Sequence, residues 1–338
     1  MKWATCLTDG VVTIVDGPPP VIGPGEILVQ MRACGICGTD VGKIYTPGYP
    51  RPTKLGHEVV GTVVEVGAGV EHFQVGQRVA LAHHVPNYGS HYSWHGNESM
   101  DPQFKRTNID PGGMAEFIRV PALHVQYTVL PVPDSIPDLR AIFMEPLACC
   151  LRALDRVPIR EGDTALIFGV GAIGMLFLPL LGDRSIHTLA TDLRKERLEA
   201  ACRLDPRLVA LTVNQDLAMI THSQTEGRGA DLAILTAVNA TIFKTALAAV
   251  RDGGTILLFG GKADVTLSFD AWNLLAREIN IITSYSSTPS TLHRALAILE
   301  RDDYAFEQIV NPVLKLDQTA QGFDLAYRAQ GSKVAIIP

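Results

Sequence analysis

Three short segments in the first half of the chain bring together side-chain types that bind metal ions. They read CGICGTD (34–40), GHE (56–58) and FMEPLA (143–148). A C-x-x-C pair alone also suits a redox site or half of a closed zinc site, and no second C-x-x-C follows it. Together the segments offer one thiolate, one imidazole and one or two carboxylates, the ligand set of a catalytic zinc with an open position.

A glycine-rich turn in the second half of the chain is typical of dinucleotide binding. Residues 169–174 read GVGAIG, follow an apolar stretch that we predict to be a strand, and open an apolar helix. In this context the first glycine permits a tight turn, the second lets backbone amides approach a pyrophosphate, and the third packs the helix against the strand. We expect the phosphates at the helix N-terminus, where unpaired N–H groups favour negative charge.

The residues after the next predicted strand bear on the choice of nucleotide. Asp192, 18 residues after Gly174, should accept hydrogen bonds from the ribose hydroxyls, which favours NAD. Basic residues from Arg194 to Arg197 could instead neutralise a 2′-phosphate, so NADP is the alternative. The candidate cofactor-binding residues are Gly169, Gly171, Ile173, Gly174, Asp192, Arg194 and Arg197, with Gly260, Ser284 and Tyr285 where the nicotinamide half is expected.

Two different patterns of predicted secondary structure divide the chain into two predicted domains. Residues 1–150 contain Val- and Ile-rich strands interrupted by glycine, at 26–33, 59–67 and 78–85, which favours a compact β-barrel or curled sheet. Residues 151–286 alternate strand and helix patterns six times, as a doubly wound parallel sheet does. The tail, residues 287–338, carries an amphipathic helix and little strand pattern, and we expect it to pack on the first domain.

Composition excludes several classes of protein. The net charge of −6 and the absence of a dense Lys/Arg stretch argue against a nucleic-acid partner. Six irregularly spaced cysteines in 338 residues do not suit a disulfide scaffold, so we expect reduced thiols in a cytoplasm. The uncharged stretch 165–181 resembles a membrane span, but its three glycines and a proline favour a buried strand followed by a helix. We expect a soluble protein with no membrane partner.

The chain as a whole resembles the zinc-dependent medium-chain alcohol and polyol dehydrogenases, the sorbitol dehydrogenase branch in particular. The motifs that carry the resemblance are CGICGTD (34–40), GHE (56–58), NIDPGGMAEF (108–117), MEPLA (144–148), GVGAIG (169–174) and TDLRKERL (191–198). The resemblance implies an α/β protein with a GroES-like β-barrel catalytic domain (1–150, completed by 287–338) and a Rossmann domain (151–286). It also implies a site in the cleft and assembly as a homodimer or homotetramer.

The resemblance assigns roles to individual residues. Cys37, His57 and Glu58 match the zinc ligands, and Glu145 matches a carboxylate that binds the metal directly or through water. Thr39 matches the hydroxyl that takes the substrate proton, and Asp40 matches the carboxylate that orients the histidine ligand. Cys34 matches no ligand, and we expect it to be a packing residue.

Some positions depart from the family. Where many relatives hold a structural zinc with four cysteines, this chain has Asn87, Ser90, Ser93 and Asp101, so we predict one zinc per chain. The histidines of the same loop (His83, His84, His91 and His95) could bind some metal, but surface histidines are the commoner explanation. Lys43 and Ser286 replace substrate-contacting residues of the polyol enzymes, which makes them candidate substrate residues and puts sorbitol itself in doubt.

The function that these observations favour is hydride transfer between NAD(H) and a secondary alcohol or ketone of a polyol, cyclitol or sugar derivative. Two alternatives are a zinc-free quinone or enone reductase of the same fold and a nucleotide-binding scaffold protein without turnover. The intact ligand set argues against both alternatives.

Overall fold

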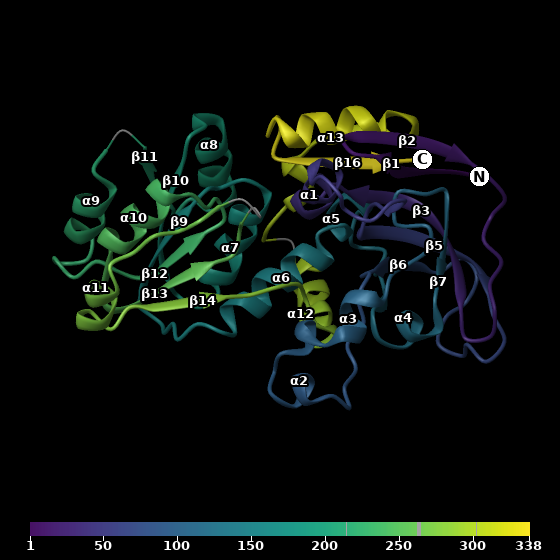
Figure 1. The fold of residues 1–338 in the computed structure, drawn as a ribbon, viewed down its shortest axis with the longest axis horizontal. Coiled ribbons are helices and arrows are strands. Elements are labelled where there is room, and N and C mark those ends of the chain that lie inside the picture. The colour runs from purple at the N-terminus through teal and green to yellow at the C-terminus, as the bar shows by residue number, and fades with distance from the viewer. Residues whose placement is uncertain (214, 262–264, 302) are drawn as a thin grey trace. The chain divides into compact units, whose positions relative to one another are not determined.

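The computed structural model describes residues 1–338 apart from 214, 262–264 and 302, and it divides into two units. The first unit comprises Met1–Ala148 and Ser287–Pro338, and the second comprises Cys149–Ser286. Figure 1 shows that both chain ends lie in the first unit. Helix α6 (Met144–Leu154) runs from the first unit into the second.

The first unit is built on two sheets. A three-stranded sheet has the order β2 (Val11–Asp16), β1 (Lys2–Thr8), β4 (Thr53–Lys54). The seven-stranded sheet has the order β15 (Val310–Lys315), β16 (Lys333–Ile337), β3 (Ile27–Gly35), β5 (Glu58–Val66), β6 (Arg78–Leu81), β8 (Val129–Pro131), and β7 (Phe117–Val120) also pairs with β3. Residues of both sheets, such as Cys6, Val29 and Val63, share one fully buried core. This is the β-rich domain that the Val- and Ile-rich strands predict.

Helices of the first unit connect and cover these strands. They are α1 (Gly38–Tyr45), α2 (His91–Trp94), α3 (Pro102–Arg106), α4 (Ala122–Tyr127), α5 (Asp138–Ala141), α12 (Pro289–Leu299) and α13 (Thr319–Tyr327). Helix α12 contains the amphipathic pattern of the tail, with Leu292 and Leu299 buried. The expectation of little strand content in the tail is wrong. Strands β15 and β16 are too short to show a clear alternation in the sequence, yet β16 pairs with β3 and buries Val334, Ala335 and Ile336.

The second unit is a six-stranded parallel sheet. Its order is β11 (Val209–Thr212), β10 (His187–Asp192), β9 (Thr164–Phe168), β12 (Ala230–Leu235), β13 (Val250–Leu258), β14 (Asn280–Thr283). Counted along the chain this is the doubly wound order 3-2-1-4-5-6. The helices are α7 (Ala172–Gly182), α8 (Lys195–Leu204), α9 (Leu217–Ser223), α10 (Ala240–Ala249) and α11 (Ala271–Ala276). Figure 1 shows α9 and α10 on one side of the strands and α7 on the other.

The uncharged stretch 165–181 forms strand β9 and most of helix α7. All five residues of β9 are buried, as are eight residues of α7 from Gly174 to Leu181. The stretch is therefore hydrophobic because it forms a buried strand of the sheet and a buried helix that follows it. Among the described residues, no helix combines the length and the hydropathy that crossing a bilayer requires.

Candidate metal and nucleotide sites

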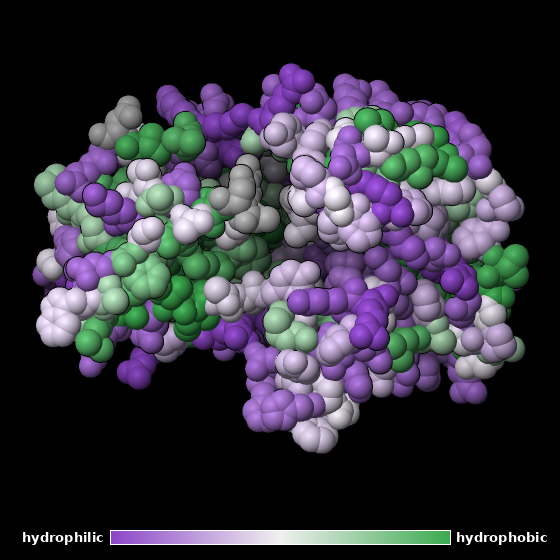
Figure 2. Space-filling model, in the orientation of Figure 1, coloured by the Kyte–Doolittle hydropathy of each residue, from purple (hydrophilic) through white to green (hydrophobic). Residues whose placement is uncertain are grey.

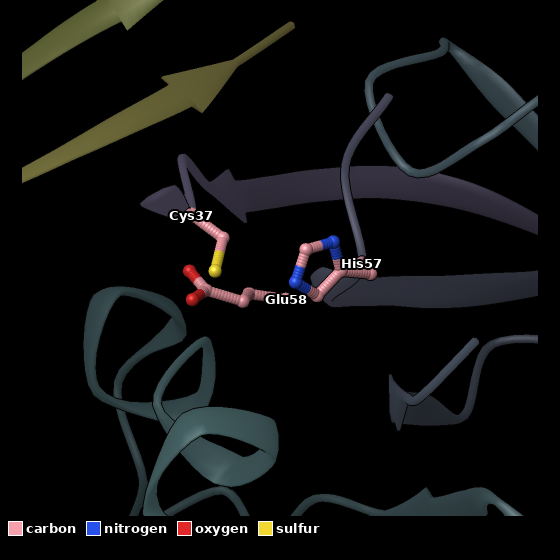
Figure 3. A group of neighbouring side chains, drawn as sticks. All are labelled: Cys37, His57 and Glu58. Carbon is pink, nitrogen blue, oxygen red and sulfur yellow. The ribbon is translucent and has the colours of Figure 1, made fainter. Parts of the chain in front are cut away.

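Two adjacent strands of the first unit bring the candidate metal ligands together. Strand β3 ends two residues before Cys37, which is the N-cap of α1, and β5 begins at Glu58, directly after His57. The antiparallel register places Gly35 opposite Glu58, so the ends of the two segments meet. One ligand atom from each of Cys37, His57 and Glu58 lies within 4.8 Å of the others (Figure 3). Residues far apart in sequence are thus positioned by strand pairing.

Asp40 orients the imidazole of this cluster. Its carboxylate is fully buried, and its Oδ2 accepts a hydrogen bond from the Gly56 N–H (3.1 Å) and lies 3.0 Å from His57 Nδ1. Oδ1 accepts a hydrogen bond from Lys43 Nζ at 2.8 Å. Burial alone would raise the pKa of Asp40, but the positive charges of His57 and Lys43 outweigh burial and hold that pKa well below its usual range. Asp40 is therefore an anion that fixes the ring of His57.

Lys333 is a residue of the site that the sequence did not reveal. Its Nζ donates to Glu58 Oε2 and to the Ile36 carbonyl (3.2 Å), and its side chain is almost fully buried. Burial lowers the pKa of Lys333, but the charge of Glu58 raises it, and the net shift is upward. A Cβ at position 35 would collide with both partners, so Gly35 leaves room for the pair. The signal available in the sequence was one lysine in an otherwise apolar strand, KVAII.

The donor set and its unpaired atoms fit a zinc ion. A thiolate, an imidazole and a carboxylate oxygen are ordinary zinc ligands. Within the described part of the chain, the buried Glu58 Oε1 has no hydrogen-bond partner, which is costly unless a bound ion interacts with it. Thr39 Oγ1 donates to Cys37 Sγ (3.2 Å) and lies 3.5 Å from His57 Nε2, so its hydroxyl faces the same cluster. The cluster can hold a metal ion with a hydroxyl beside it.

Other candidates for metal or substrate binding lie in different surroundings. Glu145 is not one of the three clustered ligands; it is buried at the start of α6 and accepts a hydrogen bond from Ser287 Oγ (3.4 Å). Lys43 makes a salt bridge with Asp40. Ser286 adopts a left-handed backbone conformation (φ 65°) at the end of the second unit. Cys34 is fully buried and, like the other five cysteines, is a free thiol.

The four histidines of residues 83–95 fall into two pairs. His83 and His84 lie inside the unit, where the His83 ring packs at a tilt against His57 (centroids 4.3 Å apart) and against His84 (3.7 Å). His91 and His95 are exposed at α2, with ring centroids 4.1 Å apart. Burial holds the pKa of His83 well below its ordinary value and lowers that of His84 to about 4.

The segment 87–101 holds its shape with local hydrogen bonds. Asn87 Oδ1 accepts from the Gly89 N–H (3.0 Å), and Ser90 Oγ caps α2 by accepting from the Ser93 N–H (3.3 Å). Ser93 Oγ donates to the Asn87 carbonyl at 2.7 Å. Asp101 caps α3 by accepting from the Gln103 N–H at 2.7 Å. All four predicted substitutes for thiolates therefore work as turn or capping residues.

The glycine-rich turn of the second unit has the expected geometry. Gly169 has a φ of +95°, which glycine adopts without strain, and Gly171 is the N-cap of α7. A Cβ at Gly174 would collide with the Gly169 carbonyl, so this glycine lets helix and strand approach closely. Ile173 is half-buried in the first turn of α7. The turn leaves backbone N–H groups at the helix N-terminus available to an anion.

Asp192 organises the strand end beside that turn. It accepts hydrogen bonds from the backbone N–H groups of Val170 and Arg194, each at 2.9 Å. Because each carboxylate oxygen has a second lone pair, ribose hydroxyls can still bind. The guanidinium of Arg197 lies over Gly171, 3.5 Å from the position a Cβ would take, and burial lowers its pKa. Carboxylate and guanidinium thus both border the glycine turn.

The remaining cofactor candidates follow the other half of the parallel sheet. Gly260 comes after β13, and a side chain there would collide with the Thr236 carbonyl. Ser284 and Tyr285 come directly after β14. The Ser284 hydroxyl is buried and has no hydrogen-bond partner among the residues described, and the Tyr285 carbonyl accepts from Arg152 (2.8 Å). They lie at the carboxyl edge of the sheet, the same edge as Gly169.

Comparisons with known proteins agree with this architecture. Residues 23–134 match the family described as "Alcohol dehydrogenase GroES-like domain", and residues 169–301 match "Zinc-binding dehydrogenase". Sorbitol dehydrogenase of Bacillus subtilis is 28% identical over 348 residues, which cover 100% of this chain and 97% of that protein. (R,R)-Butanediol dehydrogenase of Neisseria gonorrhoeae is 28% identical over 366 residues, covering 100% and 99%.

Solved structures show the same fold. Galactitol-1-phosphate dehydrogenase from Escherichia coli superposes with a TM-score of 0.88 at 24% identity, covering 100% of both chains. The two family matches, the full-length relatives and this fold lead to one conclusion. The chain belongs to the zinc-dependent medium-chain alcohol and polyol dehydrogenases, enzymes that transfer a hydride between an alcohol and a nicotinamide cofactor.

Proposed function

We propose that the chain oxidises, reversibly, a secondary alcohol of a polyol, cyclitol or sugar derivative, with NAD as hydride acceptor and one catalytic zinc. The observation that carries the proposal is the buried cluster of Cys37, His57 and Glu58, whose ligand atoms lie within 4.8 Å of one another. The sorbitol and butanediol dehydrogenases that resemble the chain act, by their names, on alcohols with more than one hydroxyl. That supports a polyol as substrate class.

Each residue in and around the cluster has a separate role in the proposed reaction. When bound, zinc polarises the alcohol oxygen and lowers its pKa, and NAD accepts the hydride. Thr39, with its hydroxyl 3.5 Å from His57 Nε2, is placed to take the alcohol proton and pass it to water. Asp40 keeps the His57 ring oriented, and Lys43 keeps Asp40 charged. Glu58 would be the third protein ligand in this proposal, and Glu145 would contact the metal through a water molecule.

NAD is the proposed cofactor because of Asp192. Its carboxylate stands at the end of β10 beside the glycine turn, where a 2′-phosphate would meet a negative charge. Arg194 and Arg197 are the residues that would accept NADP. Comparing kcat/KM for the two cofactors tests the assignment directly, and a preference for NADP would refute it.

The proposed assembly is a homodimer or a larger homo-oligomer. Strand β14 is at the edge of the parallel sheet. Helix α11, which precedes it in the chain, carries exposed apolar side chains, with Trp272 71% and Leu275 68% exposed. Figure 2 shows apolar side chains gathered on the face of the second unit that carries β14. A second copy could pair along this edge. Light scattering that gives a monomer at micromolar concentration would refute it. The six free thiols favour a cytoplasmic location.

One experiment tests the function. The protein is purified without chelator, its zinc content is measured, and a panel of secondary alcohols and polyols is screened for NAD reduction before and after chelation. The proposal predicts one zinc per chain and turnover that chelation abolishes and zinc restores. Turnover that survives chelation would instead support a zinc-free reductase, and absence of turnover with every alcohol under both cofactors would support a scaffold role.

A further inference from the structure

The histidine stack, defined as His57, His83 and His84, contains one imidazole that the proposed mechanism does not use. The His83 ring contacts the rings of both His57 (centroids 4.3 Å apart) and His84 (3.7 Å). Its side chain is 8% exposed. Because His57 belongs to the metal cluster, the ring of His83 is in direct contact with a residue of the reaction site.

Ring packing and a backbone hydrogen bond hold His83 in position, and hydrogen bonds from its own ring nitrogens take no part. His84 Nδ1 donates to the Thr107 carbonyl at 2.8 Å, and the His84 ring packs on Phe104. His124 Nε2 donates to the His83 backbone carbonyl at 3.0 Å. These contacts position His83 without using either nitrogen of its imidazole ring.

The nitrogens of His83 are unused and reachable. Among the described residues, no hydrogen bond to either ring nitrogen of His83 is formed, although His57 and His84 both contact its faces. Among the described residues, Glu58 Oε1 is a fully buried polar atom without a partner, but the His83 nitrogens do not belong to that class. The small exposed part of His83 therefore includes its nitrogens. These nitrogens are therefore open to water or to a hydroxyl of a bound substrate.

We propose that His83 is a specificity-determining residue that hydrogen-bonds a second hydroxyl of the substrate, on the carbon next to the one that is oxidised. A neutral imidazole offers one donor and one acceptor, and a hydroxyl group is both, so the two match in either tautomer. A simple alcohol without that hydroxyl would leave the imidazole unpaired, which disfavours its binding. The inference rests on the proposed function and names the feature of the substrate that the site selects.

The test uses a matched pair of substrates, 2,3-butanediol and 2-butanol, which differ by the one hydroxyl. For the zinc-loaded wild type we expect a kcat/KM for the diol at least tenfold above that for 2-butanol. His83→Phe keeps an aromatic ring in the stack but removes the hydrogen bond, so the ratio of the two kcat/KM values should fall about tenfold, chiefly through the KM of the diol. His83→Gln, which retains a donor and an acceptor, should recover most of the ratio.

His84→Phe is the control from the same stack. Its ring nitrogen is already bonded to Thr107, so the ratio should stay at the wild-type value. Zinc content and unfolding temperature are measured for every variant, and loss of zinc from His83→Phe would overturn the proposal, because His83 would then act only through His57. An unchanged ratio in His83→Phe, or a wild type without preference for the diol, would also overturn it. If the wild type turns over no alcohol at all, the proposed function itself fails and this inference falls with it.

Discussion

The Cys37–His57–Glu58 cluster and the segment 87–101 belong to the same unit but satisfy their polar groups in different ways. In the cluster, charged groups are buried around Lys333 and Asp40, and Glu58 Oε1 has no hydrogen-bond partner among the residues that the structure describes. In the segment, neutral side chains and one carboxylate bond to backbone groups within six residues of themselves. The first arrangement is incomplete without a ligand, whereas the second is complete in itself.

This difference separates the role of a catalytic metal from the role of a structural metal. The cluster is assembled by strands distant in sequence, so its geometry exists before any ion arrives and serves chemistry. A structural ion, by contrast, holds a loop that lacks other support. Because Ser90 and Asp101 cap short helices in segment 87–101, the loop has that support from hydrogen bonds.

The largest effect is expected when the cluster loses its thiolate. Cys37→Ser should lower the zinc content from one ion per chain to nearly none, because a neutral hydroxyl is a poor ligand, and should reduce kcat/KM roughly 1000-fold or more. Metal analysis after gel filtration and NAD reduction measure the two effects. Ser93→Ala is the matched control in the segment and should keep the zinc content. Two tightly held zinc ions in the wild type, one of them lost in Ser93→Ala, would refute the contrast.

A second large effect concerns the buried ion pair. Lys333→Met leaves the Glu58 carboxylate buried without its cation, which costs roughly 3–5 kcal/mol of the free energy of unfolding in the zinc-free protein. The loss should shrink when zinc is added, because the metal supplies the missing positive charge. Denaturant unfolding with and without zinc measures both values. The double variant Glu58→Gln/Lys333→Met should be more stable than Lys333→Met when zinc-free, and equal instability of the two would contradict the pairing.

The pH dependence of the free energy of unfolding should report on His84, whose ring contacts His83 and Phe104. In the unfolded chain its imidazole takes up a proton near its ordinary pKa of about 6.5, but in the folded protein burial lowers the pKa to about 4. Between these values the unfolded state binds more protons, so the free energy of unfolding falls as the pH drops from about 6.5 to about 4, by up to roughly 3 kcal/mol.

The measurement is a series of urea unfolding curves across that pH range. His84→Gln should make the decline smaller by up to roughly 3 kcal/mol, and the part that remains is expected from His83, whose pKa burial also lowers. His91→Gln, on the exposed helix α2, is the control and should leave the decline as it is in the wild type. A decline of the same size in His84→Gln would show that other groups cause it.

Residue patterns predicted some parts of this molecule better than others. The alternation of strands and helices in the second unit and the glycine turn followed from local signals, since hydrophobic runs and glycine spacing are properties of short segments. Cys37, His57 and Glu58 were identified by a resemblance between motifs, and the register of β3 and β5 accounts for their proximity. The roles of these residues stay predictions until the variants are measured.

Long-range partners were out of reach of the sequence. Lys333 lies 275 residues after Glu58, and only the pairing of β16 with β3 brings it to the carboxylate. The same pairing explains why the strands of the tail were missed. Lys43, considered as a substrate contact, has a local partner in Asp40 three residues earlier, which its helical position in α1 makes possible.

The smallest expected change in the free energy of unfolding comes from a substitution in segment 87–101. Asp101→Ala removes the N-cap of α3 and should lower the free energy of unfolding by about 1 kcal/mol, the usual cost of a lost cap. Asp101→Asn keeps an acceptor for the Gln103 N–H and should recover most of that loss. Thermal unfolding measures both, and the loss should be the same in chelator as in zinc, since this segment holds itself by hydrogen bonds. A destabilisation by Asp101→Ala that zinc reverses would show that a metal holds the segment, and the contrast with the cluster would disappear.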